Sequence, residues 1–217
     1  MARIARVVLA GHPHHVTQRG NRRQITFFCD EDYRIYRALM SEWCRRRRVS
    51  IWAYCLMPNH VHLVAVPSEP EGLALGIGEA HRRYTLRVNG REGWRGHLWQ
   101  ERFSSVLMDE THLLSAVRYV EMNPVRAGLV HCPSEYQWSS AGAHLAATDD
   151  TLVTVRPMLE MVGPWQDFLA TASEEEDDAL RRHEKTGRPL GSERFITGVE
   201  KRLGRILTPQ SPGRKRK

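Results

Sequence analysis

Lysine, closely spaced cysteine pairs and long apolar runs are scarce in this chain of 217 residues. The four cysteines, Cys29, Cys44, Cys55 and Cys132, show no C-x-x-C spacing, which argues against a zinc ribbon and a disulfide framework and favours a reducing compartment. The N-terminal apolar stretch is too short for a signal peptide, and no later segment approaches the length of a membrane span. We therefore expect a soluble protein of one or two domains that is not exported.

Only four of the 32 basic residues are lysine, and the other 28 are arginine. The net charge of +7 is distributed unevenly: residues 1–131 carry +7, residues 132–200 carry −7 and residues 201–217 carry +7. Arginine suits bidentate contacts with phosphate and stacking on bases, although a biased genomic composition explains its excess equally well. The two basic blocks therefore favour nucleic acid as a partner.

The spacing of apolar residues predicts an α+β fold in residues 1–131. Strands are predicted at 14–18, 25–28, 49–56, 60–66 and 104–108, and helices at 31–48, at 72–88 and from 111 to a point before Pro124. The last helix is expected to stop there because proline disfavours helical geometry in the residue that precedes it. Two helices interleaved with an antiparallel sheet and followed by a third indicate a sandwich of the ferredoxin-like or RNA-recognition type.

The chain changes character after residue 131. The acidic run at 174–178 follows a serine cap and precedes basic residues and Gly187, which predicts a helix better than a disordered linker. A second short helix is predicted at 192–203, and the pair forms either a helix-turn-helix or an ordinary helical hairpin. We thus expect a helical C-terminal extension at 132–208 and a solvated basic tail at 209–217.

His60 and His62 are the first candidate functional residues. They lie in a predicted strand, in which side chains alternate between faces, so both imidazoles project from one surface and form a ready pair of metal ligands. The alternative to metal binding is that the two histidines simply form the polar face of a half-exposed strand.

The third predicted helix offers a second group of polar side chains. Tyr119 lies off its apolar seam, and Asn123 is four residues later, so a phenol and an amide oxygen share one helix face. If this face covers the strand, His60, His62 and Asn123 would hold a divalent cation such as Mg²⁺ or Mn²⁺, and Tyr119 would attack a phosphate that the ion polarises. Tyr119 could instead be a boundary tyrosine with a wet hydroxyl, and Tyr84 is a rival nucleophile that has no amide four residues on.

Several runs together resemble a known family. The run Pro-Asn-His-Val-His-Leu at 58–63 resembles the HUH signature of single-tyrosine transposases, and Tyr-Val-Glu-Met-Asn-Pro at 119–124 resembles their nucleophile helix. The resemblance continues in the runs at 15–21, 98–103 and 187–191. This combination is characteristic of REP-associated tyrosine transposases, which are relatives of single-strand insertion-sequence transposases.

The resemblance implies an HUH transposase domain at 1–131 that acts as a sequence-selective single-stranded DNA endonuclease and strand transferase. Tyr119 would form a 5′-phosphotyrosine on hairpin-containing repeat DNA, with a divalent metal ion and no nucleotide cofactor. Such a protein would act in the bacterial cytoplasm, associated with the nucleoid, as a monomer or homodimer. Insertion-sequence relatives often place glutamine at the third ligand, whereas Asn123 is one methylene shorter.

Further residues are predicted to contact DNA. Arg19, Arg22 and Arg23 surround a tight turn and are either phosphate contacts or solvated turn residues. Trp99 and Arg102 combine an aromatic face with charge, as single-strand binding surfaces do, while core packing is the simpler account of Phe103. The remaining candidates are Arg82, Arg83, Arg214, Lys215, Arg216 and Lys217, and the histidines His12, His14 and His15 are expected at the surface or facing DNA.

Three other functions compete with this interpretation. A histidine-triad nucleotide hydrolase would need a third alternating histidine, where the chain has Val64. A replication initiator or relaxase would share the histidine pair but would be expected to differ in the helix that carries Tyr119. A hairpin-binding protein that keeps the fold without cleaving DNA is the non-enzymatic alternative.

Overall fold

The fold is centred on a four-stranded antiparallel sheet in a computed structural model that describes residues 4–171 and 174–208. The strands are β1 (His14–Arg19), β2 (Val49–Met57), β3 (His60–Pro67) and β4 (Ser104–Leu107), arranged in the order β2-β3-β1-β4. Helix α1 (Asp30–Arg46) joins β1 to β2, and α2 (Gly72–Glu92) joins β3 to β4. This element order and sheet order are those of a ferredoxin-like fold, so the predicted fold class is confirmed.

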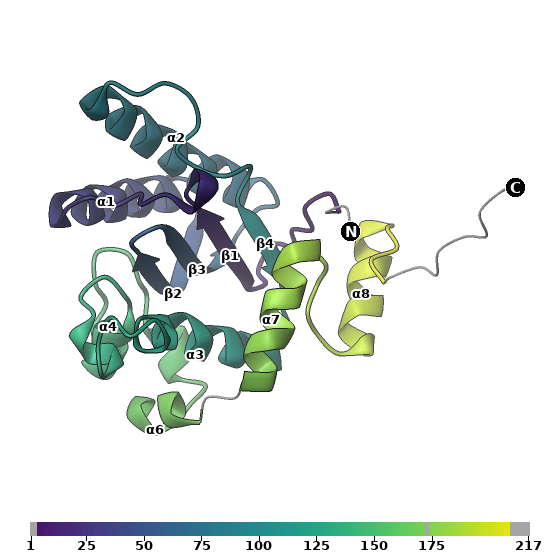
Figure 1. The fold of residues 1–217 in the computed structure, drawn as a ribbon. Helices are drawn as coiled ribbons and strands as arrows, with labels where there is room; N and C mark the ends of the chain where they lie inside the picture. Colours follow the sequence, from purple (N-terminus) through teal and green to yellow (C-terminus); the bar gives the residue numbers. More distant parts are fainter. Residues whose placement is uncertain (1–3, 172–173, 209–217) are drawn as a thin grey trace, which may run out of the picture.

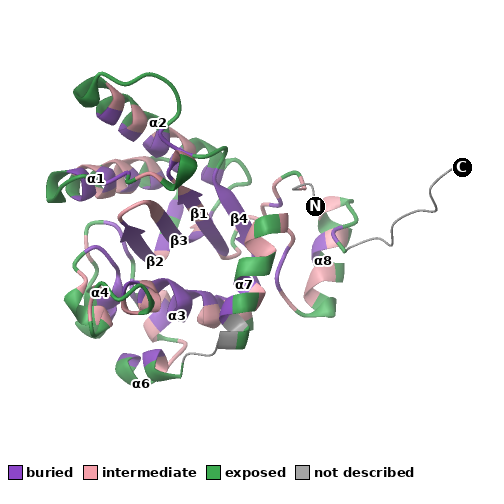
Figure 2. Ribbon diagram, viewed as in Figure 1, coloured by how far each residue is buried: buried purple, intermediate pink, exposed green. Residues whose placement is uncertain are grey.

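The two faces of the sheet carry different layers. Helices α1 and α2 cover one face (Figure 1), where Val61 and Leu63 of β3 join their apolar side chains in a common core. Because side chains alternate along a strand, His60, His62 and Val64 point to the other face. The sheet is buried on both sides (Figure 2), which makes the second face a protected setting for polar groups.

Helix α3 (Glu110–Arg126) packs on the second face. The Asp109 carboxylate accepts a hydrogen bond from the backbone N–H of His112 at 3.1 Å and caps the first turn. The helix continues through Pro124, so the prediction that it stops earlier is wrong. Proline removes one N–H, which would have donated to the carbonyl of Val120, and it does so only in the last turn of the helix, which limits the cost of this interruption.

The strand predicted at 25–28 is absent. A 3-10 turn (Asn21–Arg23) and an irregular segment occupy this part of the chain. The N–H groups of Thr26 and Phe27 both donate to the carbonyl of Pro58, at 2.9 and 3.2 Å. Two successive amides that converge on one carbonyl cannot form a ladder with a neighbouring strand, so the segment covers the β2–β3 turn instead.

The segment after residue 131 is helical where the structure describes it. It contains η2 (Pro133–Glu135), α4 (Ala141–Leu145), α5 (Arg156–Leu159), α6 (Trp165–Ala170), α7 (Glu174–Thr186) and α8 (Glu193–Leu203). The helical prediction for the acidic run is therefore confirmed. Helix α7 packs against α3 and β4, whereas α8 packs through Val199 on Val7 and Leu107. These contacts do not support a helix-turn-helix.

The extension shares its core with the sheet and covers both sheet edges. Apolar side chains of α5, α6 and α7 pack in one cluster with those of β2, β3 and α3. At the β2 edge, the N–H of Thr154 donates to the carbonyl of Ile51 at 2.9 Å, and at the β4 edge the N–H of Leu190 donates to that of Leu107 at 2.8 Å. The extension therefore packs as part of the same structural unit as the sheet. Among the described residues, no helix combines the length and apolarity needed to cross a membrane.

Candidate metal and nucleophile site

The histidine pair and the tyrosine meet on the second face of the sheet. His60 and His62 lie two residues apart on β3, with their ring centroids 5.0 Å apart. The ring of Tyr119 on α3 stands edge-on to His62 with a centroid distance of 5.4 Å. Two segments separated by more than fifty residues are thus brought together as the sequence pattern predicted.

Each histidine of the pair uses Nδ1 for a contact within the protein. His60 Nδ1 lies 2.6 Å from Asn59 Oδ1, which only accepts, so this nitrogen carries the proton. His62 Nδ1 lies 3.0 Å from His15 Nε2. His62 Nε2 is buried without a hydrogen-bond partner among the described residues. A buried ring nitrogen with an unused lone pair is available to coordinate a metal ion. The residues therefore fit the metal that the family resemblance implies.

Burial keeps the imidazoles neutral. It lowers the pKa of His60 to about 3, helped by the nearby positive charge of Arg19. Burial likewise holds the pKa of His62 well below its ordinary value, with smaller contributions from His60 and His15. Neutral imidazole is the form that coordinates a metal ion, so no proton has to be displaced at neutral pH.

Asn123 is placed one turn after Tyr119 on α3. Its side chain is half-buried, and its Nδ2 donates to the carbonyl of Tyr119 at 3.1 Å. This hydrogen bond directs the NH₂ group toward the preceding helical turn. The amide oxygen is a suitable hard ligand for Mg²⁺ or Mn²⁺. Its role as the third ligand stays a prediction.

Tyr119 is buried, and two arginine side chains lie against its ring. Its side chain is only 6% exposed, and the guanidinium groups of Arg126 and Arg181 lie 5.3 and 5.6 Å from its ring centroid. Burial and the charge of Glu184 raise the pKa of Tyr119, and a hydrogen bond from Arg181 opposes this rise. The tyrosine is therefore close to groups that stabilise its phenolate.

Tyr84 has a different setting. It is fully buried in α2, whose apolar face packs on the first face of the sheet. Its hydroxyl donates to the carbonyl of Thr26 at 2.7 Å. Tyr84 therefore lies on the opposite side of the sheet from the histidine pair, and it serves the core.

His15 and Glu184 lie at the site, although neither was predicted there from the sequence. The expectation that His14 and His15 lie at the surface is wrong, because both are fully buried. The register pairs His15, Thr17 and Arg19 with Val64, His62 and His60, which places these β1 side chains on the face of the histidine pair. The strand register carries this information, and spacing along the sequence alone does not.

The predicted arginine contacts are distributed over two regions. Arg19 and Arg102 line a pocket of about 530 Å³ beside Glu184 and Lys185. Arg22 and Arg23 are exposed on the 3-10 turn, and both adopt positive φ, 53° and 62°. This basic surface begins directly at the end of β1 and lies next to His60 in the sheet register.

Arg82 and Arg83 lie apart from this surface. They are exposed on α2 and bind Glu79 at 2.7 and 2.8 Å. Helix α2 covers the face of the sheet opposite the histidine pair, so contacts with DNA at these two residues would be remote from Tyr119.

The prediction that Trp99 stacks on bases is not supported by its position. Its side chain is 7% exposed, and the ring packs 5.0 Å from that of His81. Phe103 is equally buried in the same core, as the simpler account expected. The four basic residues of the tail, Arg214 to Lys217, lie outside the described residues.

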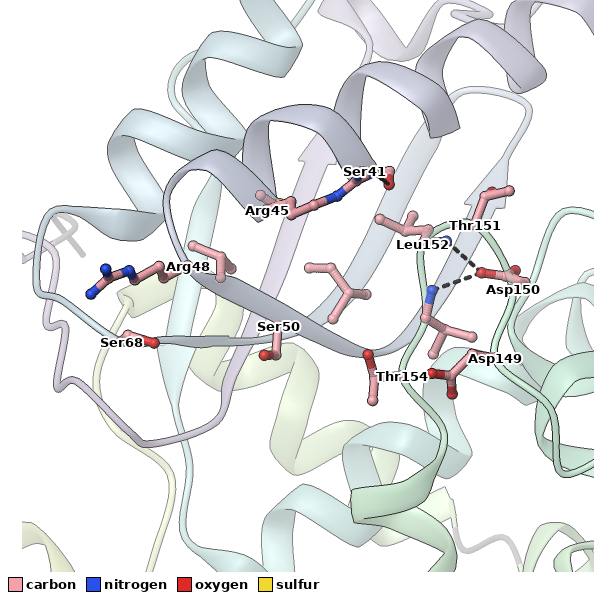
Figure 3. Close-up of a pocket in the computed structure, with 14 residues that line it drawn as sticks. Ser41, Arg45, Arg48, Ser50, Ser68, Asp149, Asp150, Thr151, Leu152 and Thr154 are labelled. Atoms are coloured by element: carbon pink, nitrogen blue, oxygen red, sulfur yellow. Dashed lines mark hydrogen bonds between the residues drawn. The ribbon is translucent and has the colours of Figure 1, made fainter.

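Figure 3 shows a second pocket, of about 490 Å³. It is lined by Val49 and Ser68 and so lies at the opposite end of β3 from His60, because Val49 pairs with Pro67 in the sheet. Its acidic side chains are used for structure. Asp150 Oδ1 accepts the N–H groups of Leu152 and Val153 at 2.6 and 2.7 Å, and Asp149 accepts that of Val155 at 2.8 Å. The carboxylates thus hold the loop against the edge of β2, and the pocket does not form part of the candidate site.

A ferredoxin-like sheet that presents two histidines beneath a tyrosine-bearing helix has the architecture of the single-tyrosine HUH transposases. Residues 8–123 match the family described as "Transposase IS200 like". The chain belongs to this family, and the resemblance to REP-associated tyrosine transposases is confirmed.

Two relatives are similar to the chain. A protein of Haemophilus influenzae, provisionally named a REP-associated tyrosine transposase, is 24% identical over an alignment of 116 residues, and the match covers 48% of this chain and 66% of the relative. The chain thus spans just under two thirds of that relative's length. A solved REP-associated tyrosine transposase bound to a REP hairpin has a TM-score of 0.56 and 20% identity, with 71% of this chain and 92% of the other covered. The second similarity supports the shared fold.

Proposed function

We propose that the protein is a single-stranded DNA endonuclease and strand transferase that uses Tyr119 as its nucleophile. The observation that carries the proposal is the contact of the Tyr119 ring with His62, whose centroids are 5.4 Å apart. His62 Nε2 has no hydrogen-bond partner in the part of the chain that the structure describes, so it is available as a metal ligand. A tyrosine, two neutral imidazoles and an adjoining basic surface are the groups that phosphodiester cleavage needs.

The chemistry is a transesterification. Tyr119 Oη forms a bond to the phosphorus, the bond from phosphorus to the 3′ oxygen breaks, and the phenolic proton is lost to solvent while the leaving oxygen gains one. The product is a 5′-phosphotyrosine and a free 3′-hydroxyl, which can later reverse the step without an external energy source. A divalent ion, Mg²⁺ or Mn²⁺, held by His60, His62 and Asn123 would supply stabilisation of the charge on the phosphate oxygens.

Hairpin-containing repeat DNA is the proposed substrate. Support comes from the solved relative, which is bound to a REP hairpin. The arginines at the end of β1 and the pocket beside them offer positive charge to a strand that approaches the site. Recognition of a particular sequence would select the strand that is cut.

The test uses single-stranded hairpin DNA labelled at its 3′ end, because a 5′-phosphotyrosine retains the downstream fragment. Wild-type protein with Mn²⁺ should give a labelled adduct that survives denaturing electrophoresis, and Tyr119→Phe should bind the DNA without forming one. Tyr84→Phe is the matched control and should form the adduct. An adduct at the wild-type level with Tyr119→Phe would contradict the assignment of the nucleophile.

The alternative function is a hairpin-binding protein that does not cleave DNA. The burial of Tyr119, which is 6% exposed, favours this alternative because it limits access of a phosphate to the hydroxyl. A protein that only binds hairpins would retain the DNA in the same experiment and give no adduct in the wild type.

A further inference from the structure

A chain of three side chains runs from the C-terminal extension to the histidine pair. Glu184 of α7 places Oε1 3.4 Å from His15 Nδ1. His15 Nε2 in turn lies 3.0 Å from His62 Nδ1. Both imidazoles are buried, and Glu184 is the outermost member with its side chain 22% exposed.

The two imidazoles meet edge to edge. Their planes differ by only 6°, and their centroids are 5.2 Å apart while the facing nitrogens are 3.0 Å apart. The contact is therefore made by ring nitrogens in nearly one plane, which is the geometry of an N–H···N hydrogen bond. One nitrogen must donate and the other must accept.

The charge of the carboxylate sets the direction of this hydrogen bond. His15 Nδ1 has no hydrogen bond among the described residues, so its 3.4 Å contact with Glu184 Oε1 is electrostatic. A negative charge at this distance favours the proton of His15 on Nδ1, the ring nitrogen that faces the carboxylate. His15 Nε2 is then an acceptor, and the proton of His62 must lie on Nδ1. His62 Nε2, which has no partner among the described residues, consequently keeps its lone pair directed away from His15.

We propose that Glu184 and His15 are positioning residues that fix the tautomer and the ring orientation of His62 for metal binding. The proposal rests on the metal-dependent function proposed above. For His60 the same part is played by the neighbouring Asn59, at 2.6 Å. Partners of this kind behind a ligating histidine raise its basicity and hold its ring in place.

Through Glu184, the C-terminal extension contributes to the positioning of a metal ligand. Glu184 lies outside residues 8–123, which match the transposase family. Helix α7 carries Asp177, Arg181 and Glu184 at spacings of four and three residues, so all three lie on one helix face. Asp177 binds Arg126 at 2.8 Å, and Arg181 covers the Tyr119 ring. This face of α7 therefore contacts the nucleophile directly and reaches His62 through His15.

The first experiment reads the tautomer directly in the full-length, metal-free protein. Long-range ¹H–¹⁵N NMR spectra of the histidine rings should show His62 protonated at Nδ1 in the wild type. Glu184→Ala should give a mixture of the two His62 tautomers, and Glu184→Gln, whose amide oxygen still accepts, should retain more of the wild-type form. Glu175→Ala, an exposed position on the same helix, is the matched control and should leave the spectrum unchanged.

The second experiment measures Mn²⁺ affinity by calorimetry without DNA. Glu184→Ala should bind Mn²⁺ about 10 to 100-fold more weakly, Glu184→Gln should lose less, and Glu175→Ala should bind as the wild type does. Thermal unfolding of each variant shows that the fold is kept. Because neither measurement needs DNA or cleavage, a failure here is distinguishable from a failure of the proposed endonuclease function.

Two results would overturn the proposal. Wild-type tautomer and wild-type Mn²⁺ affinity in Glu184→Ala would show that the contact is only structural. Complete loss of Mn²⁺ binding in Glu184→Ala and His15→Ala, with binding kept in His60→Ala, would show that His15, His62 and Glu184 hold the ion directly, a grouping that their mutual proximity also allows.

Discussion

Tyr119 lies between groups that act on its acidity in opposite directions. Desolvation in the space between α3 and α7 and the charge of Glu184 raise its pKa, while the guanidinium of Arg181 stabilises the phenolate. The phenolate is the stronger nucleophile toward phosphorus. Arg181 therefore sets how alkaline the solution must be before the tyrosine becomes reactive.

Replacing Arg181 by glutamine should shift the pH–rate profile of cleavage to higher pH. Loss of the cation raises the pKa of Tyr119 further, so a smaller fraction of phenolate is present at neutral pH and the rate there falls. Single-turnover cleavage from neutral to alkaline pH at a fixed metal concentration measures the shift. Arg182→Gln makes the same charge change at an exposed position of α7 and should leave the profile in place; a common shift in both variants would indicate a general charge effect.

Alanine substitution should separate the histidines from Asn123. His60→Ala or His62→Ala should abolish Mn²⁺-supported cutting because a nitrogen ligand is lost. Asn123→Ala should reduce the rate less, since water can replace an amide oxygen as a ligand. Cleavage rates across a Mn²⁺ titration measure both effects. Undiminished cutting by the wild type in excess chelator would exclude a role for the metal.

Helix α3 carries two kinds of polar group on different faces. Tyr119 faces the histidine pair, and two residues later the fully buried Glu121 faces the extension. Its carboxylate accepts from Ser140 Oγ at 2.5 Å, His144 Nδ1 at 2.6 Å and Trp165 Nε1 at 2.9 Å. A carboxylate with three buried donors connects the nucleophile helix to α4 and α6 and fixes its rotation on the sheet.

Glu121→Ala should lower the free energy of unfolding by about 3 kcal/mol, because three buried donors lose their acceptor. Trp165→Phe removes one donor and keeps an aromatic ring, so its cost should be about 1 kcal/mol. Urea unfolding of both variants measures the difference. Equal costs would mean that packing, and not the hydrogen bonds to Glu121, supports this junction.

Element prediction from the sequence succeeded where the apolar pattern was periodic. The four strands of the sheet, α1, α2 and the shared face of Tyr119 and Asn123 followed from local spacing, whereas the short run at 25–28 did not form a strand. Pro124 was misjudged because a proline in the last turn of a helix removes only one backbone hydrogen bond, which the packing of α3 on the sheet tolerates. His15 and Glu184 were missed because their places depend on strand register and on the docking of α7, and neither is encoded by spacing within one segment.

At the scale of the molecule, charge is separated along the chain. Residues 132–200 are net acidic, and they pack against a sheet domain that is net basic, with a basic segment after them. Ion pairs such as Arg126–Asp177 at 2.8 Å use part of this complementarity in holding the extension to α3. The arginines at the end of β1 lie beyond these contacts, on the side from which DNA would approach.

Deleting residues 209–217 should weaken binding of all single-stranded targets to a similar degree. Arg214, Lys215, Arg216 and Lys217 are predicted to contact phosphates, and four contacts would contribute about 2.8 to the salt slope at most, at about 0.7 each. Binding titrations at several salt concentrations measure the slope, and the preferred cleavage position should not change. An unchanged slope would show that the tail is only solvated.

Because the extension covers both outer strands, the edges of the sheet are exposed while the chain is being synthesised. The carbonyls of Ile51 and Leu107 receive their partners from Thr154 and Leu190, which are made after the last strand of the sheet. An open strand edge is a template for pairing with another chain. During translation the sheet therefore passes through an interval in which both edges are bare, and crowding of nascent chains on one messenger would then favour intermolecular β-aggregation over folding.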